Sequence, residues 1–255
     1  MAKTMLSVAS LSIGYGPKTI LENLDFSIPK GCFVGVVGVN GVGKSTLMRT
    51  LGGFQSALAG EIQLENQPLQ TILPNPLAKL RSVVLTEQGV AQNLTVQELI
   101  ALGRYPYTNW WGKLTEEDHQ QILKSLELLE LVPLKDQKFH ELSDGQRQRV
   151  WLARALAQQT PLILLDEPTT HLDLYHKIQI LKMLQSISHR EEKTILFTTH
   201  EINMALQLCD RILLLDTASS AFGTPAELIS GGHFQRLFPK GMVDFDEKTG
   251  AFVIK

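Results

Sequence analysis

The most regular feature of the chain is a set of short, uninterrupted apolar runs, each bounded by glycine or by charged residues. These runs are rich in Val, Ile and Leu, have the length of a strand, and do not alternate with polar residues as a half-exposed strand does. Continuous hydrophobicity of this kind is expected where helices cover both faces of a parallel sheet. We therefore expect buried central strands at residues 32–38, 81–87, 161–167, 193–200 and 211–216.

Shorter segments near the two ends of the chain follow a different pattern. Residues 6–16 and 60–66 alternate better between apolar and polar positions, which indicates a small antiparallel piece. Near the C-terminus, the turn signal at residues 248–250 lies between two strand-like stretches. We therefore expect the tail, residues 239–255, to form a β-hairpin.

The stretch between the second and third apolar runs has a helical texture instead. Thr95 with Glu98 has the spacing of a capping box, and Thr115 with the acidic residues behind it opens a second run with helical spacing. We interpret residues 89–140 as a helical insert within one α/β domain that spans residues 5–238.

Composition limits the class of protein but does not name it. The chain has 255 residues, 44% of them hydrophobic and 20% charged, which is enough for a large core and too apolar for disorder. A net charge of −2 gives no general attraction to nucleic acid or anionic lipid. Cys32 and Cys209 lie far apart in apolar runs, as expected of buried thiols in a reducing compartment. Since no signal peptide and no membrane-spanning run is recognisable, we expect a cytoplasmic, soluble chain.

The first candidate for chemistry is the stretch GVNGVGKST, which matches the phosphate-binding pattern GxxxxGK[ST]. Its glycines let backbone amides converge on phosphate oxygens, its lysine adds a point charge, and its serine offers a hydroxyl to Mg²⁺. A strand-like run precedes it and a helical segment follows, although a plain glycine-rich turn before a helix would look similar. The predicted nucleotide-binding residues here are Gly38, Asn40, Gly41, Gly43, Lys44, Ser45 and Thr46.

A second candidate is the acidic pair Asp166 and Glu167, which ends the apolar run at 161–167. Phosphoryl transfer needs a held Mg²⁺ and an oriented water molecule, and one carboxylate can serve each need. By itself an Asp-Glu pair is often only the polar end of a strand. Together with the phosphate-binding loop it indicates a nucleoside triphosphatase.

A third stretch, ELSDGQRQRV at residues 141–150, has the form of a helix N-terminus with free N–H groups. The glycine-rich loop, the strand ending in Asp-Glu and the LSDGQ sequence shortly before that strand occur in the order of the ABC ATPase family, whose signature is LSGGQ. The chain resembles this family over essentially its whole length. The resemblance implies an α/β fold with a P-loop NTPase core, a small antiparallel β subdomain and an inserted helical subdomain.

In that family two ATPase subunits pair head to tail, and ATP lies between the phosphate-binding loop of one and the signature helix of the other. The resemblance therefore implies that Ser143, Gly145 and Gln146 contact the nucleotide held by a second copy of the chain. The alternative is that Ser143 and Gln146 form an ordinary capping box and nothing more.

Other family positions can be transferred one at a time. The resemblance implies that Tyr15 stacks on adenine, that Gln88 reaches Mg²⁺ and the water, that Asp173 contacts the opposite subunit, and that His200 contacts the γ-phosphate. An exposed aromatic residue or a polar strand end would equally explain Tyr15 and His200. The implied ligands are ATP and Mg²⁺, with Glu167, His200 and Gln88 as catalytic residues. The implied metal-binding residues are Ser45, Gln88 and Asp166.

Asp144 departs from the family pattern, because the signature usually has glycine at this position. Its carboxylate would repel a γ-phosphate if it pointed inward. We expect it to point outward, as a cap for the helix.

The family serves several functions, and this sequence favours transport. The phrases at residues 98–107, 154–158, 168–181 and 199–215 look like those of ATPases that import ferric siderophores, haem and cobalamin. The implied partners are integral-membrane permease subunits, a second copy of this chain and, indirectly, a substrate-binding protein, with no nucleic acid. The implied location is the cytoplasmic face of the inner membrane. The alternatives are an importer for a metal ion or another small solute, and a soluble ATPase acting on nucleic acid or an inactive regulator.

The helical insert would carry the surface that docks the permease. Two adjacent tryptophans, Trp110 and Trp111, lie in it, and both cannot face the core of one helix. One of them is therefore a candidate for an exposed docking contact, and burial of both around an intervening loop is the alternative.

Overall fold

The computed structural model describes residues 3–86, 93–170, 172–216, 219–237, 243–246 and 251–254. Its central element is a six-stranded sheet with the order β10-β9-β3-β8-β7-β6. All neighbouring strands in it run parallel except β10, which is antiparallel to β9. The strands are β3 (Phe33–Val37), β6 (Arg81–Val84), β7 (Leu162–Leu165), β8 (Thr194–Thr199), β9 (Arg211–Leu214) and β10 (Ala221–Gly223).

The five apolar runs therefore form the five parallel strands, which confirms the prediction. Alternate side chains of these strands enter two different cores, one on each face of the sheet. In β3, Phe33 and Val37 belong to one core, and Val34 and Val36 belong to the other. This division explains why the runs are apolar at every position.

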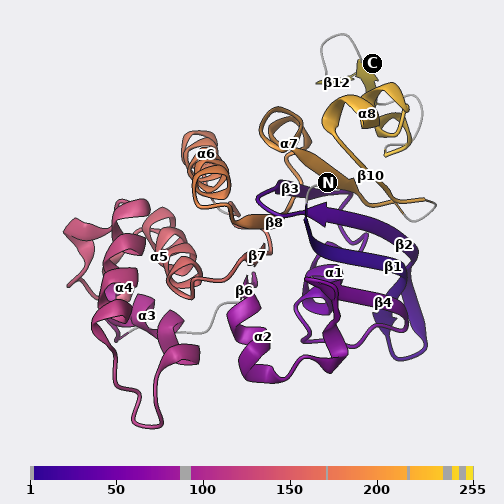
Figure 1. Cartoon of the computed structure of the whole chain (residues 1–255). Helices are drawn as coiled ribbons and strands as arrows, with labels where there is room; N and C mark the ends of the chain where they lie inside the picture. Colours follow the sequence, from indigo (N-terminus) through magenta and orange to yellow (C-terminus); the bar gives the residue numbers. More distant parts are fainter. Residues whose placement is uncertain are drawn as a thin grey trace.

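A second sheet, antiparallel and four-stranded, has the order β2-β1-β4-β5. It lies on the side of the central sheet opposite the helical region (Figure 1). Its presence confirms the predicted antiparallel piece. Its strands are β1 (Thr4–Tyr15), β2 (Lys18–Pro29), β4 (Ala59–Leu64) and β5 (Gln67–Pro68).

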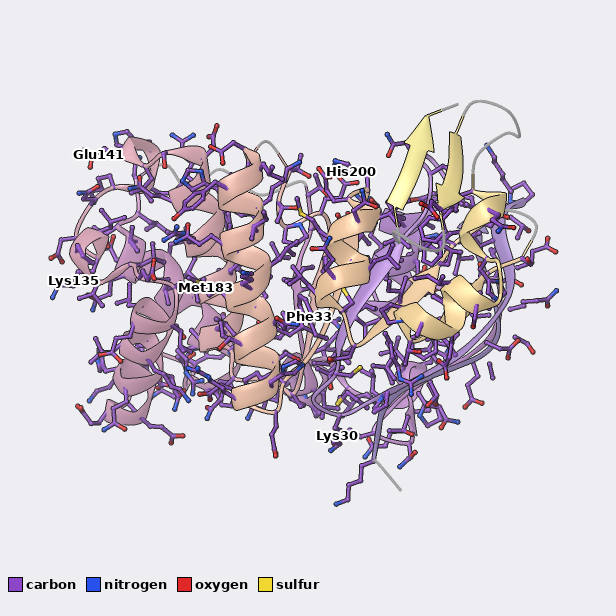
Figure 2. All side chains as sticks on the ribbon, turned by 90° about the horizontal axis from the view of Figure 1, so that it is seen from above. Lys30, Phe33, Lys135, Glu141, Met183 and His200 are labelled. Carbon is purple, nitrogen blue, oxygen red and sulfur yellow. The ribbon has the colours of Figure 1, made fainter. Side chains whose placement is uncertain are left out.

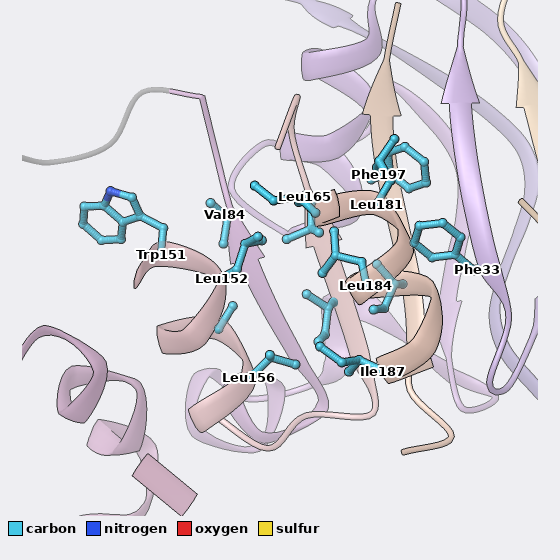
Figure 3. Close-up of a cluster of buried hydrophobic side chains, with 14 of the residues drawn as sticks. Phe33, Val84, Trp151, Leu152, Leu156, Leu165, Leu181, Leu184, Ile187 and Phe197 are labelled. Carbon is cyan, nitrogen blue, oxygen red and sulfur yellow. The ribbon is translucent and has the colours of Figure 1, made fainter. Parts of the chain in front are cut away.

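Helices fill the remaining space. Leu152 and Leu156 of α5 pack with Leu181 and Leu184 of α6 over the sheet, whereas Trp151 of α5 points away from α6 (Figure 3). Helices α3 and α4 gather around α5 on one side of the molecule (Figure 1). The α-helices are α1 (Lys44–Leu51), α2 (Pro74–Leu80), α3 (Val96–Ala101), α4 (Glu116–Leu128), α5 (Asp144–Ala157), α6 (Leu174–Arg190), α7 (Ile202–Leu208) and α8 (Pro225–Ser230). The 3₁₀ helices are η1 (Leu69–Thr71), η2 (Leu102–Tyr107), η3 (Val132–Leu134), η4 (Phe139–Glu141) and η5 (Phe234–Arg236).

The capping box predicted at Thr95 is present, and the helix start predicted at Thr115 also has a capping box. Thr95 and Glu98 cap α3, and Thr115 caps α4 together with Asp118. Between these helices, Trp110 and Trp111 are 96% and 86% exposed, so neither is buried. The region therefore presents two adjacent aromatic side chains to its surroundings.

In the tail, β11 (Val243–Asp246) pairs antiparallel with β12 (Ala251–Ile254). The ring of Phe245 in β11 stacks on that of Phe234 in η5, with 5.1 Å between the ring centroids. This contact joins the strand pair to the apolar core beside α8.

Candidate functional site

The glycine-rich loop connects β3, at the centre of the large sheet, to helix α1. Gly41 and Gly43 have φ angles of 80° and 112°, a region that glycine enters far more readily than other residues. A Cβ atom on Gly43 would lie 2.7 Å from Ile20 Cγ2, so no larger residue fits there. Because α1 starts directly after Gly43, which has no side chain to cap it, the N–H groups of its first turn remain available to an anion.

Lys44 is the first residue of α1 and is buried in the loop. Its Nζ donates hydrogen bonds to the carbonyl oxygens of Gly38 (2.9 Å) and Val39 (3.2 Å). Burial lowers the pKa of Lys44, and the nearby carboxylates of Glu167 and Asp166 oppose this shift. An anion in the loop would compensate the desolvated ammonium group, so the loop fits a phosphate.

Asp166 follows β7 and is buried among hydroxyl groups from three other elements. Its Oδ1 accepts hydrogen bonds from Thr198 Oγ1 (2.8 Å) and Ser45 Oγ (3.2 Å), and its Oδ2 accepts one from Thr86 Oγ1 (3.0 Å). An exposed serine hydroxyl next to a fixed carboxylate provides oxygen ligands of the kind that Mg²⁺ prefers. The described residues contain no group of three or more His, Cys, Asp or Glu side chains that could hold a metal. This donor set therefore fits a Mg²⁺ that takes its other ligands from phosphate and water.

Glu167, the next residue, is held in an unusual backbone conformation. Its φ angle is 49°, which costs free energy for a residue with a side chain. Its N–H donates to Thr198 Oγ1 at 2.7 Å, and its Oε2 accepts a hydrogen bond from Thr170 Oγ1 at 2.9 Å. Thr198 thus holds the backbone of Glu167, and Thr170 orients its partly buried carboxylate beside Asp166 and Lys44.

Two further predicted residues lie at the ends of strands near this loop. Tyr15 ends β1, is half-exposed, and its hydroxyl lies 3.3 Å from Thr46 Oγ1 in the first turn of α1. His200 follows β8 and is also half-exposed, with Nε2 3.5 Å from Glu201 Oε1. Tyr15 thus contacts the loop region directly, and the contact given for His200 is with its neighbour.

The signature stretch forms the start of α5. Ser143 is the N-cap, with Oγ accepting from the N–H of Gln146 (3.3 Å), and the Gln146 side chain accepts in return from the N–H of Ser143 (2.9 Å). Within this chain, both polar side chains therefore cap their own helix. Gly145 lies in the first turn of α5. A Cβ atom on it would meet only Leu172 Cδ2, at 3.7 Å, so there is open space beside Gly145.

The side chain of Asp144 is 74% exposed and lies 3.4 Å from Arg147 Nη1. The expectation that it points outward is confirmed. The expectation that it caps the helix is wrong, because the cap is formed by Ser143 and Asp144 already lies inside the first turn.

Asp173 is the N-cap of α6, as Ser143 is of α5. Its Oδ1 accepts from the N–H of His176 at 2.9 Å, and both carboxylate oxygens lie 2.9 Å from His176 Nδ1. These hydrogen bonds hold the pKa of Asp173 below its ordinary value. Gln88, predicted for Mg²⁺ and water, lies outside the described residues.

The predicted residues thus fall into two separate groups. One group surrounds α1 and the ends of β1 and β7, and the other lies at the starts of α5 and α6. Figure 2 shows Glu141, two residues before Ser143, at one edge of the molecule and His200 apart from it, near the middle of the view. The hydrogen bonds described for Ser143 and Gln146 join these two residues to each other and do not include the phosphate-binding loop.

The sequence analysis did not single out the threonines that hold the acidic pair. Thr86, Thr170 and Thr198 all donate hydrogen bonds to Asp166 or Glu167. Their signal was present, because Thr86 and Thr198 stand at or just beyond the carboxyl ends of predicted parallel strands, where ligand sites of such sheets form.

Comparison with known proteins identifies the family. The family model described as ABC transporter matches residues 21–170. The chain is 36% identical over 91% of its length to the iron(3+)-hydroxamate import ATP-binding protein FhuC of Bacillus subtilis, of which the match covers 87%. The chain therefore belongs to the ABC transporter family, and it is an ATP-binding and ATP-hydrolysing cassette of that family.

Solved structures agree with this assignment. A transporter assigned to the metal-chelate type, in an inward-facing conformation, matches with a TM-score of 0.80 and 30% identity, over 92% of this chain and 89% of that one. The cassette MJ0796, a dimer in a post-hydrolysis state with ADP and Pi, matches with a TM-score of 0.73 and 27% identity, over 85% of this chain and 98% of that one. Among the described residues of the present chain, no helix is both long and apolar enough to cross a membrane.

Proposed function

We propose that the chain powers an importer for an iron–siderophore, haem or cobalamin-type substrate. The observation that carries the proposal is the match to FhuC over most of both chains, since FhuC is an ATP-binding protein of iron(3+)-hydroxamate import. The likeness to a transporter assigned to the metal-chelate type supports the same class of substrate. An importer for a metal ion or another small solute is the alternative.

The phosphate-binding role rests on the geometry around α1. We infer that the backbone of residues 38–46 and Lys44 Nζ hold the β- and γ-phosphates of ATP, while Tyr15 covers the adenine. Ser45 and Asp166, with Gln88, would bind Mg²⁺. The bound metal would neutralise charge on the phosphate oxygens and keep them aligned for displacement.

Glu167 is the proposed general base. Its carboxylate, oriented by Thr170, would accept a proton from the water that attacks the γ-phosphorus, and His200 would contact the γ-phosphate. Lys44 donates to two carbonyl oxygens in this structure, and it would turn one or more of its N–H groups to phosphate when ATP binds.

The separation of the two groups supports a head-to-tail dimer. Ser143, Gly145 and Gln146 would face the γ-phosphate of the second copy, and Asp173 would lie at the contact between the two chains. The dimeric cassette MJ0796 is a precedent for such pairing among similar structures.

The membrane partner follows from the same proposal. A domain at residues 5–238 would contain the ATPase, and its insert, residues 89–140, would dock a permease at the cytoplasmic face of the membrane. Trp110 and Trp111 are candidates for that contact because both are exposed. A substrate-binding protein would deliver the cargo to the permease.

Replacement of Glu167 by glutamine tests the catalytic role. Loss of a general base costs about 10² to 10⁴ in rate, so we expect turnover to fall on that scale while ATP still binds. Glu192→Gln is a matched control, because Glu192 has nearly the same backbone conformation, with φ of 50°. Unchanged hydrolysis in Glu167→Gln, measured by phosphate release, would exclude Glu167 as the base.

The transport role is tested with the same variant. Tagged Glu167→Gln protein is isolated from native membranes with Mg²⁺ and ATP, and the proteins that accompany it are identified by mass spectrometry. We expect a permease with many membrane-spanning helices. A purely soluble complex or a nucleic-acid-processing partner would refute the importer.

A further inference from the structure

A single threonine hydroxyl joins the two acidic residues of the nucleotide site. Thr198, the second-last residue of β8, is fully buried. Strand β8 pairs in parallel with β7, with Phe197 opposite Leu165, so Thr198 comes beside Asp166, the first residue after β7. Its Oγ1 lies 2.8 Å from Asp166 Oδ1 and 2.7 Å from the backbone nitrogen of Glu167. The hydroxyl thus connects the proposed metal ligand to the proposed base.

The direction of both hydrogen bonds follows from the protons that are available. A hydroxyl has one proton to donate and lone pairs that accept, an ionised carboxylate only accepts, and a backbone N–H only donates. The hydroxyl of Thr198 therefore gives its proton to Asp166 and accepts the N–H of Glu167. An aliphatic side chain of the same shape could do neither.

The two acidic residues do not depend on this hydroxyl equally. Asp166 has two other donors, Ser45 Oγ and Thr86 Oγ1, which remain if the hydroxyl of Thr198 is removed. For the N–H of Glu167, the hydrogen bond that the structure describes is the one to Thr198. Loss of the hydroxyl should therefore disturb Glu167 more than Asp166.

Glu167 needs this hydrogen bond because its backbone conformation is strained. Its φ of 49° lies in a region that residues with a side chain rarely adopt and keep only where surrounding contacts hold them. The backbone conformation sets the direction in which the side chain leaves the chain, and Thr170 holds the far end by donating to Oε2. A relaxed backbone would move the carboxylate even with Thr170 in place.

We propose that Thr198 is a positioning residue for ATP hydrolysis. Its hydroxyl keeps Glu167 in the positive-φ conformation that directs the carboxylate to the attacking water. This inference rests on the proposed role of Glu167 as general base and adds the group that sets its geometry. Thr198 acts through Glu167 and not on the nucleotide itself.

The first experiment separates catalysis from binding. Thr198→Val keeps the branched shape that suits a strand and removes the hydroxyl. Since a misplacement of about 1 Å can cost about 100-fold in rate, we expect kcat to fall by about 10- to 100-fold. The Kd for ATP should stay within about threefold, because the phosphate-binding loop is unchanged. An unchanged kcat in Thr198→Val would overturn the proposal.

The conservative variant tests whether the hydroxyl itself is responsible. Thr198→Ser keeps the hydroxyl and loses only a methyl group, so its kcat should lie within about threefold of the unchanged chain. A serine variant as slow as Thr198→Val would show that the methyl packing matters and the hydroxyl does not.

Thr160→Val is the matched structural control. Thr160 is also fully buried, just before β7, and its Oγ1 lies 2.9 Å from the carbonyl oxygen of Leu162 and 3.1 Å from Ser82 Oγ. We expect both valine variants to lower the Tm, and only Thr198→Val to lower kcat. An equal loss of kcat in both would show that Thr198 only stabilises the fold.

A second measurement does not depend on activity. Hydrogen exchange of the Glu167 amide is followed by NMR in the chain without nucleotide. Loss of the hydrogen bond to Thr198 should speed this exchange at least about fivefold in Thr198→Val, whereas Thr198→Ser and Thr160→Val should leave it nearly unchanged. Equal protection of the Glu167 amide in all variants would contradict the proposed anchor.

A double variant distinguishes this inference from the base role of Glu167. If Thr198 acts through Glu167, Thr198→Val should not lower the residual rate of Glu167→Gln any further. A further fall would show that Thr198 acts through another group, such as Asp166, and the inference would be wrong while Glu167 could remain the base. Normal hydrolysis by Glu167→Gln alone would instead refute the base role, and this inference with it.

Discussion

At the scale of single residues, Asp144 has an unusual position for its charge. It lies next to Ser143 in the stretch that we propose faces the nucleotide of a second copy, yet its side chain is 74% exposed and lies beside Arg147. A carboxylate engaged by an arginine on its own helix repels a phosphate less than a free one does. Asp144 is therefore compatible with the proposed contact.

Asp144→Gly tests this interpretation. An exposed ion pair contributes roughly 0 to 1 kcal/mol, so we expect a slight fall in stability and an ATPase rate within about threefold of the unchanged chain. Ser143→Ala is the control, because it removes the N-cap and costs about 1 kcal/mol of stability. A large gain in ATPase rate or in ATP affinity for Asp144→Gly would show that the carboxylate does repel the nucleotide.

At the scale of elements, a buried ion pair joins helix α4 to the rest of the helical region. Arg104 in η2 donates to Asp118 of α4 at 2.7 Å and to the carbonyl oxygen of Ala157, at the end of α5, also at 2.7 Å. Both side chains are almost fully buried. Arg104 thereby holds three helical segments together.

Asp118→Asn leaves the Arg104 guanidinium buried without its counter-charge. Removal of one partner from a buried pair costs about 3 to 5 kcal/mol, which we expect as a loss in the free energy of unfolding measured in urea. Glu117→Gln, next to it on an exposed position, should cost less than about 1 kcal/mol. Equal small losses for both variants would show that the pair contributes little.

The same carboxylate makes the helical region sensitive to acid. Burial acts to raise the pKa of Asp118, but hydrogen bonds from Thr115 and Arg104 outweigh it and hold that pKa below its ordinary value. The contribution to stability is therefore present above the ordinary pKa of Asp, about 3.9, and is lost as the pH falls towards the lower folded-state value. Unfolding midpoints measured between about pH 5 and pH 2 should fall less steeply in Asp118→Asn than in the unchanged chain.

Element boundaries also show where local patterns stop being informative. The capping box at Thr95 predicts where the helix starts but not where it stops, and α3 ends at Ala101, where a 3₁₀ helix follows. A Cβ on Gly103 would lie 2.2 Å from the carbonyl oxygen of Arg154, so the chain passes very close to α5 there. This contact with a distant helix is invisible in the local sequence.

At the scale of the whole molecule, the two groups of nucleotide-binding candidates predict assembly. In the proposed head-to-tail dimer, the signature of one chain completes the nucleotide site of the other, so hydrolysis would require a second chain. We expect Glu167→Gln with Mg²⁺-ATP to form a dimer, seen by light scattering as a doubled mass, because the bound nucleotide is not turned over.

Two controls belong to that measurement. The protein without nucleotide and the double variant Glu167→Gln/Lys44→Ala should both remain monomeric, because neither holds ATP between two chains. A monomer at saturating ATP would contradict assembly by the ATPase alone and would assign it to the permease.

The amino-acid sequence alone was sufficient for most features that depend on neighbouring residues, although it placed a helix cap at Asp144 where Ser143 forms it. Apolar runs, helix caps and the phosphate-binding loop are local, because their hydrogen bonds or burial patterns involve residues a few positions apart. The family follows from these stretches and from their order, and the match to residues 21–170 confirms it.

Only the tertiary structure decided which distant groups meet. Asp166 is held by Thr86 and Thr198, 80 and 32 positions away, and the strand order β10-β9-β3-β8-β7-β6 does not follow the chain. The exposure of both Trp110 and Trp111 likewise depends on packing between separate elements. The physical reason is that burial and pairing are set by all the atoms around a side chain, most of which come from remote parts of the sequence.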